Sequence, residues 1–166
     1  MMDLEPDLEA LLETWGSEEA IYTFLEREIE GININCFDGR LSLPQVQVKP
    51  MWLSRGLLGE RRSGADYEPA NGDKPAVIGL FSVVLRDEHS ARIALAHEMI
   101  HHWEMTTEEE CHEGSYPKQV DKMIRQHFSE MTKEQVWRIG HSARFIWKAC
   151  KGADSLDIPV RELLFR

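Results

Sequence analysis

The sequence predicts an α+β fold in a single domain, and three observations support this prediction. Residues 17–30 carry apolar side chains at helical spacing, residues 45–85 contain short runs rich in β-branched side chains, and the second half of the chain has helical periodicity. A length of 166 residues is enough to bury one hydrophobic core. We expect residues 1–16 to form an acidic N-terminal lead-in and residues 17–166 to form the domain.

The first predicted helix covers residues 17–30. Ser17 is suited to cap its N-terminus, and Gly31 is suited to end it. Its apolar residues form one stripe that a core can bury: Ala20, Ile21, Phe24, Leu25 and Ile29. Residues 33–40 are then predicted to be a turn.

A small three-stranded sheet is expected to follow. Residues 45–49 alternate between polar and apolar side chains, with valine at the apolar positions, which predicts a half-buried strand. A second short strand is expected at residues 51–53, followed by a polar loop up to residue 75. The apolar, β-branched run over residues 75–85 is predicted to contain the third strand.

The next helix is predicted to be the buried centre of the domain. Asp87 is a suitable N-cap, and the helix should run to about Glu104. It is apolar on nearly all sides, as is typical of a helix with no solvent face. Trp103 is expected in the core, whereas His102 and Glu104 are expected at the helix edge.

Further helices are expected towards the C-terminus. One is predicted over residues 117–128, and a last long helix should run from a cap at Ser129 or Thr132 to Gly152. The apolar tail at residues 156–164 can fold back on the core.

The buried helix contains His97-Glu98-Met99-Ile100-His101, an HExxH pattern. Residues four apart lie on one face of a helix, so both imidazoles can bind one cation. Glu98 is offset from this line, so its carboxylate can accept a proton from a water molecule that attacks a carbonyl carbon. The pattern predicts a zinc site with His97 and His101 as ligands and Glu98 as the catalytic general base. In the alternative interpretation, both histidines form hydrogen bonds within the core and Glu98 faces solvent.

A catalytic zinc ion has three protein ligands and one open position, so a third ligand is required. His141 is the preferred candidate, because the neighbouring Gly140 would allow the backbone to approach the metal closely. His112 is the first rival, and Glu130 or Glu134 could supply a carboxylate instead. Spacing alone does not decide among them.

Several sequence pieces, in this order, carry a family resemblance: an amphipathic first helix, Phe37-Asp-Gly-Arg-Leu-Ser-Leu-Pro44, a strand before the buried helix, Ala96-His-Glu-Met-Ile-His101, and Gly140-His141 followed by Phe145. From about Ser17 to Arg161 the chain resembles the SprT-like domain, the zinc metallopeptidase-type domain also found in Spartan proteases that cut DNA–protein crosslinks. The resemblance implies a zincin-like fold, metalloprotease activity, and His141 as the third zinc ligand.

The chain departs from the family pattern near the third histidine. Ser142 replaces the second glycine of a GHG motif, and Arg144 stands where an acidic or other polar residue is usual. The separation between His101 and His141 is longer than is common in the family, so residues 104–139 are expected to be an inserted helical segment. The resemblance implies a minimal form without the C-terminal zinc ribbon of many bacterial members.

These observations predict a zinc-dependent metalloendopeptidase, a hydrolase that cleaves peptide bonds of protein substrates by zinc-activated water with Glu98 as general base. The alternative is a non-catalytic, zinc-stabilised binding or regulatory module that could associate with DNA. Cleavage with and without a chelator distinguishes the two. Tyr116 is a weak candidate for an electrophilic helper at the transition state.

Charge and cysteine content limit the expected partners and location. The chain has 19 basic and 29 acidic residues, a net charge of −10, which disfavours DNA as a partner, although Arg55, Arg61 and Arg62 could contact nucleic acid. No apolar run approaches the roughly 18 residues that span a bilayer, so no membrane partner is expected. The N-terminus lacks a signal-peptide pattern and the three cysteines are widely spaced, which favours a cytoplasmic protein.

Overall fold

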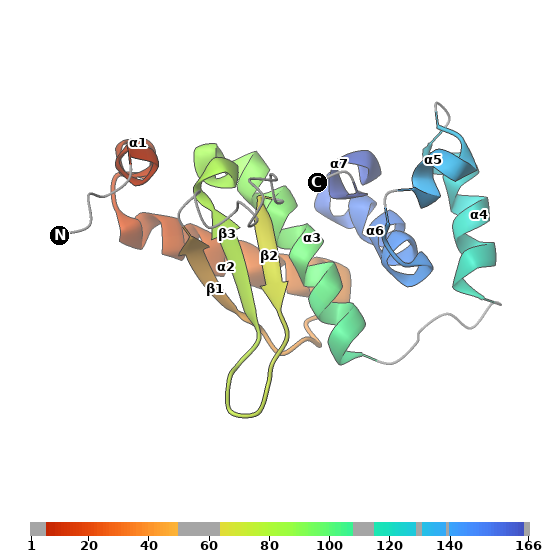
Figure 1. The fold of residues 1–166 in the computed structure, drawn as a ribbon, viewed down its shortest axis with the longest axis horizontal. Helices are drawn as coiled ribbons and strands as arrows, with labels where there is room; N and C mark the ends of the chain where they lie inside the picture. Colours follow the sequence, from red (N-terminus) through yellow and green to blue (C-terminus); the bar gives the residue numbers. More distant parts are fainter. Residues whose placement is uncertain (1–5, 50–63, 108–114, 129–130, 139, 165–166) are drawn as a thin grey trace, which may run out of the picture.

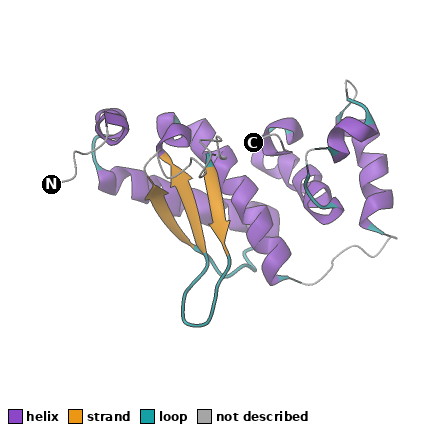
Figure 2. Cartoon of the chain, in the orientation of Figure 1, coloured by secondary structure: helices purple, strands orange, loops and turns teal. Residues whose placement is uncertain are grey.

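The computed structural model describes residues 6–49, 64–107, 115–128, 131–138 and 140–164. In these ranges the chain is an α+β protein with seven α-helices and one small mixed sheet of three strands, which confirms the predicted class (Figures 1 and 2). The elements are, in order, α1 (Pro6–Trp15), α2 (Glu18–Phe37), β1 (Gln45–Lys49), β2 (Ala65–Glu68), β3 (Val77–Phe81), the 3-10 helix η2 (Ser82–Arg86), α3 (Glu88–Thr106), α4 (Tyr116–His127), α5 (Lys133–Trp137), α6 (Ala143–Leu156) and α7 (Val160–Leu164).

Helix α3 lies at the centre of this arrangement. It packs against α2 and strands β2 and β3 on one side and against α6 and α7 on the other, and Figure 1 shows α4 and α5 beyond α6. The core therefore surrounds α3, as its sequence predicts. None of the helices in the described ranges has the length and apolarity needed to cross a membrane.

The N-terminal region contains one helix that was not predicted and one that is longer than predicted. Part of the predicted lead-in forms α1, where Leu11 is buried and the indole N–H of Trp15 donates to the backbone oxygen of Leu85 at 2.7 Å. Ser17 caps α2 as predicted, but Gly31 does not end it. The helix continues to Phe37 and so covers much of the predicted turn, because packing of its last turns into the core outweighs the low helix propensity of glycine.

The sheet has the order β1-β3-β2, with β1 parallel to β3 and β2 antiparallel to it. Strands β1 and β3 lie where the sequence predicts strands, whereas the strand expected at residues 51–53 lies outside the described residues. Strand β2 lies inside the predicted polar loop. Alternate side chains of the three strands pack into the core: Val46, Val48, Ala65, Tyr67, Ile78 and Leu80.

The predicted last long helix is two helices. Thr132 caps α5 with a capping box, and Ser142 caps α6. The chain breaks between them at Gly140, whose φ of +87° is unfavourable for other residues. Gly152 does not end α6, which runs on to Leu156, and the predicted tail forms α7 with Leu163 and Leu164 buried.

Candidate metal centre

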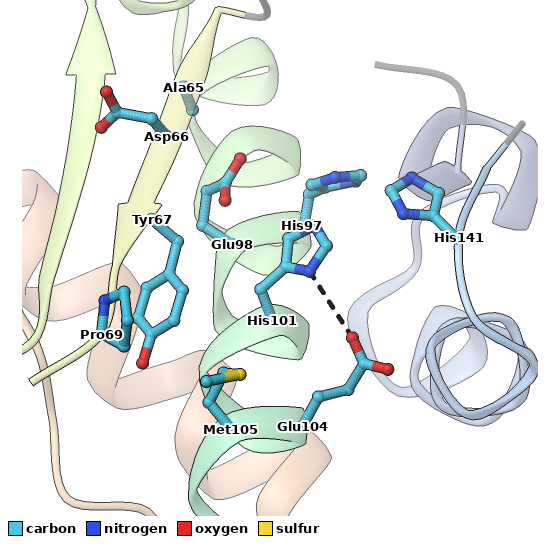
Figure 3. A pocket seen from close by; sticks show the side chains of 10 residues that line it. All are labelled: Ala65, Asp66, Tyr67, Pro69, His97, Glu98, His101, Glu104, Met105 and His141. Carbon is cyan, nitrogen blue, oxygen red and sulfur yellow. Dashed lines mark ion pairs between the residues drawn. The ribbon is translucent and has the colours of Figure 1, made fainter.

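Helix α3 carries the predicted HExxH residues at its middle. The carboxylate of Asp87 caps the helix by accepting from the backbone N–H of Ser90 at 2.7 Å, which fixes where the helix begins. The 19-residue helix then carries residues 97–101 between the sheet and α6. Of these residues, His97, Glu98 and His101 line a cleft between β2 and His141 (Figure 3).

Three histidines converge at this point. Each of His97, His101 and His141 offers one ring nitrogen, and these three nitrogens all lie within 4.8 Å of one another. The first two rings come from successive turns of α3, while His141 precedes the first turn of α6 (Figure 3). The three imidazoles are therefore close enough to bind one metal ion.

The hydrogen bond of His97 indicates which of its nitrogens can bind a cation. Nδ1 lies 2.6 Å from the backbone oxygen of Leu163 in α7. Because a carbonyl oxygen only accepts, Nδ1 carries the hydrogen and the lone pair is on Nε2. A backbone carbonyl behind a metal-binding imidazole commonly fixes the ring and its tautomer in this way.

His141 is kept in the neutral form that can coordinate a metal. Burial lowers the pKa of its imidazole, the nearby His101 lowers it further, and the backbone of Leu164 acts in the opposite direction. Its ring also stacks on Phe145, with the ring centres 4.1 Å apart. Phe145 therefore supports the third histidine from the first turn of α6.

Glu98 is 4% exposed and lines the cleft beside the histidines. Figure 3 shows its carboxylate on the β2 side of the histidine cluster. Burying a carboxylate in an apolar core costs free energy unless polar contacts compensate for the lost hydration. Its position is compatible with proton transfer to a group bound in the cleft.

The cleft has a volume of about 480 Å³. Strand β2 and the residues after it form one wall, α3 forms the floor, and His141 lies opposite (Figure 3). Both apolar and ionisable side chains line it: Ala65, Asp66, Tyr67, Pro69, His97, Glu98, His101, Glu104, Met105 and His141.

His102, next to the candidate ligands, holds the wall of the cleft. It is 3% exposed, rather than at the helix edge as predicted. Nε2 lies 2.6 Å from the backbone oxygen of Ser42 and must donate to it, so Nδ1 accepts from the hydroxyl of Tyr67 at 2.9 Å. Burial lowers the pKa of His102, which keeps the ring neutral. The histidine thereby ties β2 to α3.

Of the candidates for the third ligand, the structure describes His141 and Glu134. In the described ranges His141 forms a group of possible metal ligands with His97 and His101. Glu134 is exposed on α5 and is not part of a group of possible ligands there. His112 and Glu130 lie outside the described residues. Gly140 has a positive φ of +87°, which by itself favours glycine at this position.

Several cleft residues were not predicted. Tyr67, Pro69 and Met105 line the cleft, but no motif marks them. Tyr116, which the sequence offered only as a candidate helper, is buried against the ring of Trp147 and is not among the residues that line the cleft. Glu104 lies on the cleft rather than at an outer edge, and its position three residues after His101 could have indicated this.

Comparison with known proteins gives no match: no family model, no curated protein and no solved structure is similar to this chain. The SprT-like resemblance therefore stays a prediction, and the geometry of the three histidines and Glu98 is the feature that bears on function.

Proposed function

We propose that the chain is a zinc-dependent endopeptidase of the SprT-like, zincin type, in which His97, His101 and His141 hold the metal and Glu98 is the general base. The observation that carries the proposal is the convergence of three imidazoles beside a buried glutamate in an open cleft. A site with three protein ligands and open space is typical of catalytic rather than structural zinc.

The donor set fits zinc. Neutral imidazole nitrogen is a preferred ligand of Zn²⁺, and three of them match the ligand number of a catalytic site. The hydrogen bond from His97 Nδ1 to Leu163 supplies the outer support that such ligands usually have. The lowered pKa of His141 leaves its lone pair available at neutral pH.

The residues of the cleft would share the work of hydrolysis. Zinc, when bound, lowers the pKa of water and polarises a carbonyl oxygen. The carboxylate oxygens of Glu98 would take the proton from the attacking water and deliver it to the nitrogen of the leaving amine. The β2 wall, held by Tyr67 and His102, would orient an extended substrate strand beside the metal.

The substrate we propose is a protein or peptide. The open cleft has apolar side chains on its rim, including Met105, which is 63% exposed. The net charge of −10 counts against DNA as an obligate partner. We also infer a cytoplasmic location, since Cys36 and Cys150 are free thiols.

The first test is cleavage of an unfolded protein such as casein. We expect the zinc-loaded protein to cleave it, a chelator to stop cleavage and added zinc to restore it. Glu98→Gln should bind metal with unchanged stoichiometry and lose cleavage by roughly 100- to 10,000-fold, because a positioned general base contributes about that much. Glu88→Gln, an exposed glutamate of the same helix, is the matched control and should remain active. Full activity of Glu98→Gln would exclude the catalytic role.

One observation favours a second candidate, a zinc-stabilised module without turnover. The candidate ligands join α3, α6 and, through Leu163, α7, so a bound metal would also hold these helices together. This candidate predicts that zinc stabilises the fold while the wild-type protein cleaves no substrate.

A further inference from the structure

A second carboxylate, that of Glu104, lines the cleft next to His101. It is three residues after His101 on the same face of α3, and its Oε2 lies 3.5 Å from His101 Nδ1 (Figure 3). The side chain is only 19% exposed. A carboxylate at Nδ1 favours a hydrogen on that nitrogen and a lone pair on Nε2, which is the tautomer that could bind a metal in the cleft.

The other oxygen of the same carboxylate reaches the loop that carries His141. Oε1 of Glu104 accepts a hydrogen bond from the hydroxyl of Ser142. That hydroxyl also accepts from the backbone N–H of Phe145 at 3.0 Å, as the N-cap of α6. The residue next to His141 is therefore fixed both to its own helix and to α3.

The backbone of Glu104 is held by α6 as well. Arg144 donates to the backbone oxygen of Glu104 at 2.9 Å and to that of Thr107 at 2.8 Å, and its guanidinium lies 4.3 Å from the ring centre of Trp103. Contacts with α6 therefore hold both the backbone and the side chain of Glu104.

We propose that Glu104 is a positioning residue of the metal centre, which orients His101 directly and sets the place of His141 through Ser142. This inference rests on the proposed metal site. It also gives a role to Ser142, which replaces the second glycine of the GHG motif: its hydroxyl links Glu104 to the segment that carries His141. Glu104 is not itself in the group of converging ligand atoms, which in the described ranges consists of the three histidines.

The test is a metal titration of the purified full chain. Zn²⁺ affinity is measured by competition with a chromophoric chelator, and the absorption spectrum of bound Co²⁺ reports the geometry of the site. Glu104→Ala should bind Zn²⁺ roughly 10- to 100-fold more weakly, the range typical for loss of an outer-shell partner, and should alter the Co²⁺ spectrum. Glu88→Gln should change neither.

A second variant separates positioning from helix capping. Ser142→Asp keeps a good N-cap for α6 but places a carboxylate opposite Glu104. We expect weaker metal binding, and thermal unfolding of the metal-free protein measures separately what the repulsion costs the fold. The double variant Glu104→Ala/Ser142→Asp should bind no more weakly than Ser142→Asp alone, because removing Glu104 also removes the repulsion. If Glu104→Ala does not fold, Glu104→Gln replaces it, with a smaller expected loss.

The outcomes distinguish this inference from the proposed function. Tight binding by wild type and by both single variants would overturn the role of Glu104 and leave the metal site intact. Complete loss of binding in Glu104→Ala, equal to that in His141→Ala, would make Glu104 a ligand instead. A wild-type protein that binds no metal would overturn both proposals.

Discussion

Helices α2 and α3 are similar in length, with 20 and 19 residues, but they differ in what they bury. Each begins at a polar N-cap, and each packs against the other. Helix α2 buries apolar side chains and a single polar one, Asn33. Helix α3 buries three polar side chains: His97, Glu98 and His102. A fold that needed only packing would not place so many polar groups in its central helix.

Two of these buried polar residues serve the same structural purpose. Asn33 exchanges hydrogen bonds with the backbone of Leu41, at 3.0 and 3.1 Å, and His102 bonds the backbone of Ser42. Both helices thus anchor the loop before β1. The other two buried polar side chains of α3, His97 and Glu98, line the cleft. Helix α2 has no counterpart of these two residues, and they are the ones available for chemistry.

The largest expected effects, on stability and on metal binding, distinguish His102 from His141, two histidines whose pKa values are both lowered by burial. His102→Ala should lower the free energy of unfolding by about 3 kcal/mol, because it leaves a cavity and removes two buried hydrogen bonds, and metal stoichiometry should stay unchanged. His141→Ala should abolish metal binding with a much smaller effect on the metal-free protein. Urea unfolding in chelator and metal analysis measure the two properties. If both variants lose metal equally, the assignment of a structural role to His102 and of metal binding to His141 is wrong.

Metal binding should stabilise the α3–α6–α7 side more than the α2 side. Zinc at 100 times its dissociation constant should add about 2.7 kcal/mol to the free energy of unfolding. Hydrogen exchange should show the added protection from local opening in α6 and α7, whereas α1 should change little. The variant His141→Ala, treated with the same zinc concentration, is the control. Equal protection of every helix would mean that the metal acts only on global unfolding.

The two N-caps should differ in their response to pH. Replacing Ser17 or Asp87 by alanine should cost about 1 kcal/mol at neutral pH. Hydrogen bonds from Ser90, with its backbone N–H foremost, lower the pKa of Asp87. Its contribution is therefore complete above about pH 4, the unfolded value, and is lost as pH falls through the lower folded value. Unfolding measured across this range should show the Asp87→Ala difference shrinking and the Ser17→Ala difference constant. A cost for Asp87→Ala that does not change with pH would contradict this explanation.

Local signals predicted the parts of the fold that depend on a few adjacent residues. The Ser17 and Asp87 caps, the alternation of β1 and the spacing of His97 and His101 are examples. Strand β2 was missed, because Asp66 and Glu68 resemble loop residues. Their charges are balanced by Lys49, whose Nζ lies 3.1 Å from Asp66 and 3.4 Å from Glu68, and that partner is known only once the sheet has formed.

The same limit applies to the site. The spacing of the motif predicts two converging imidazoles, and the family resemblance predicts the third. The supports could not be predicted, because Leu163, Ser142 and Tyr67 reach the histidines or the cleft wall only through tertiary packing. A chain's local pattern can specify ligands, but the partners that orient them come from distant segments.

The smallest effects concern two glycines, Gly31 and Gly140, that differ in backbone conformation. Gly31 lies inside α2 with nothing within 4 Å of the place of a Cβ, so Gly31→Ala should stabilise the protein by about 0.5–1 kcal/mol. Gly140 has equal space but a φ of +87°, so Gly140→Ala should destabilise it by about 1 kcal/mol and, by shifting His141, weaken zinc binding. Thermal unfolding and zinc titration of the two variants test this, and effects of the same sign on stability would refute the distinction. The opposite signs follow from backbone conformation alone, since neither glycine has a close neighbour.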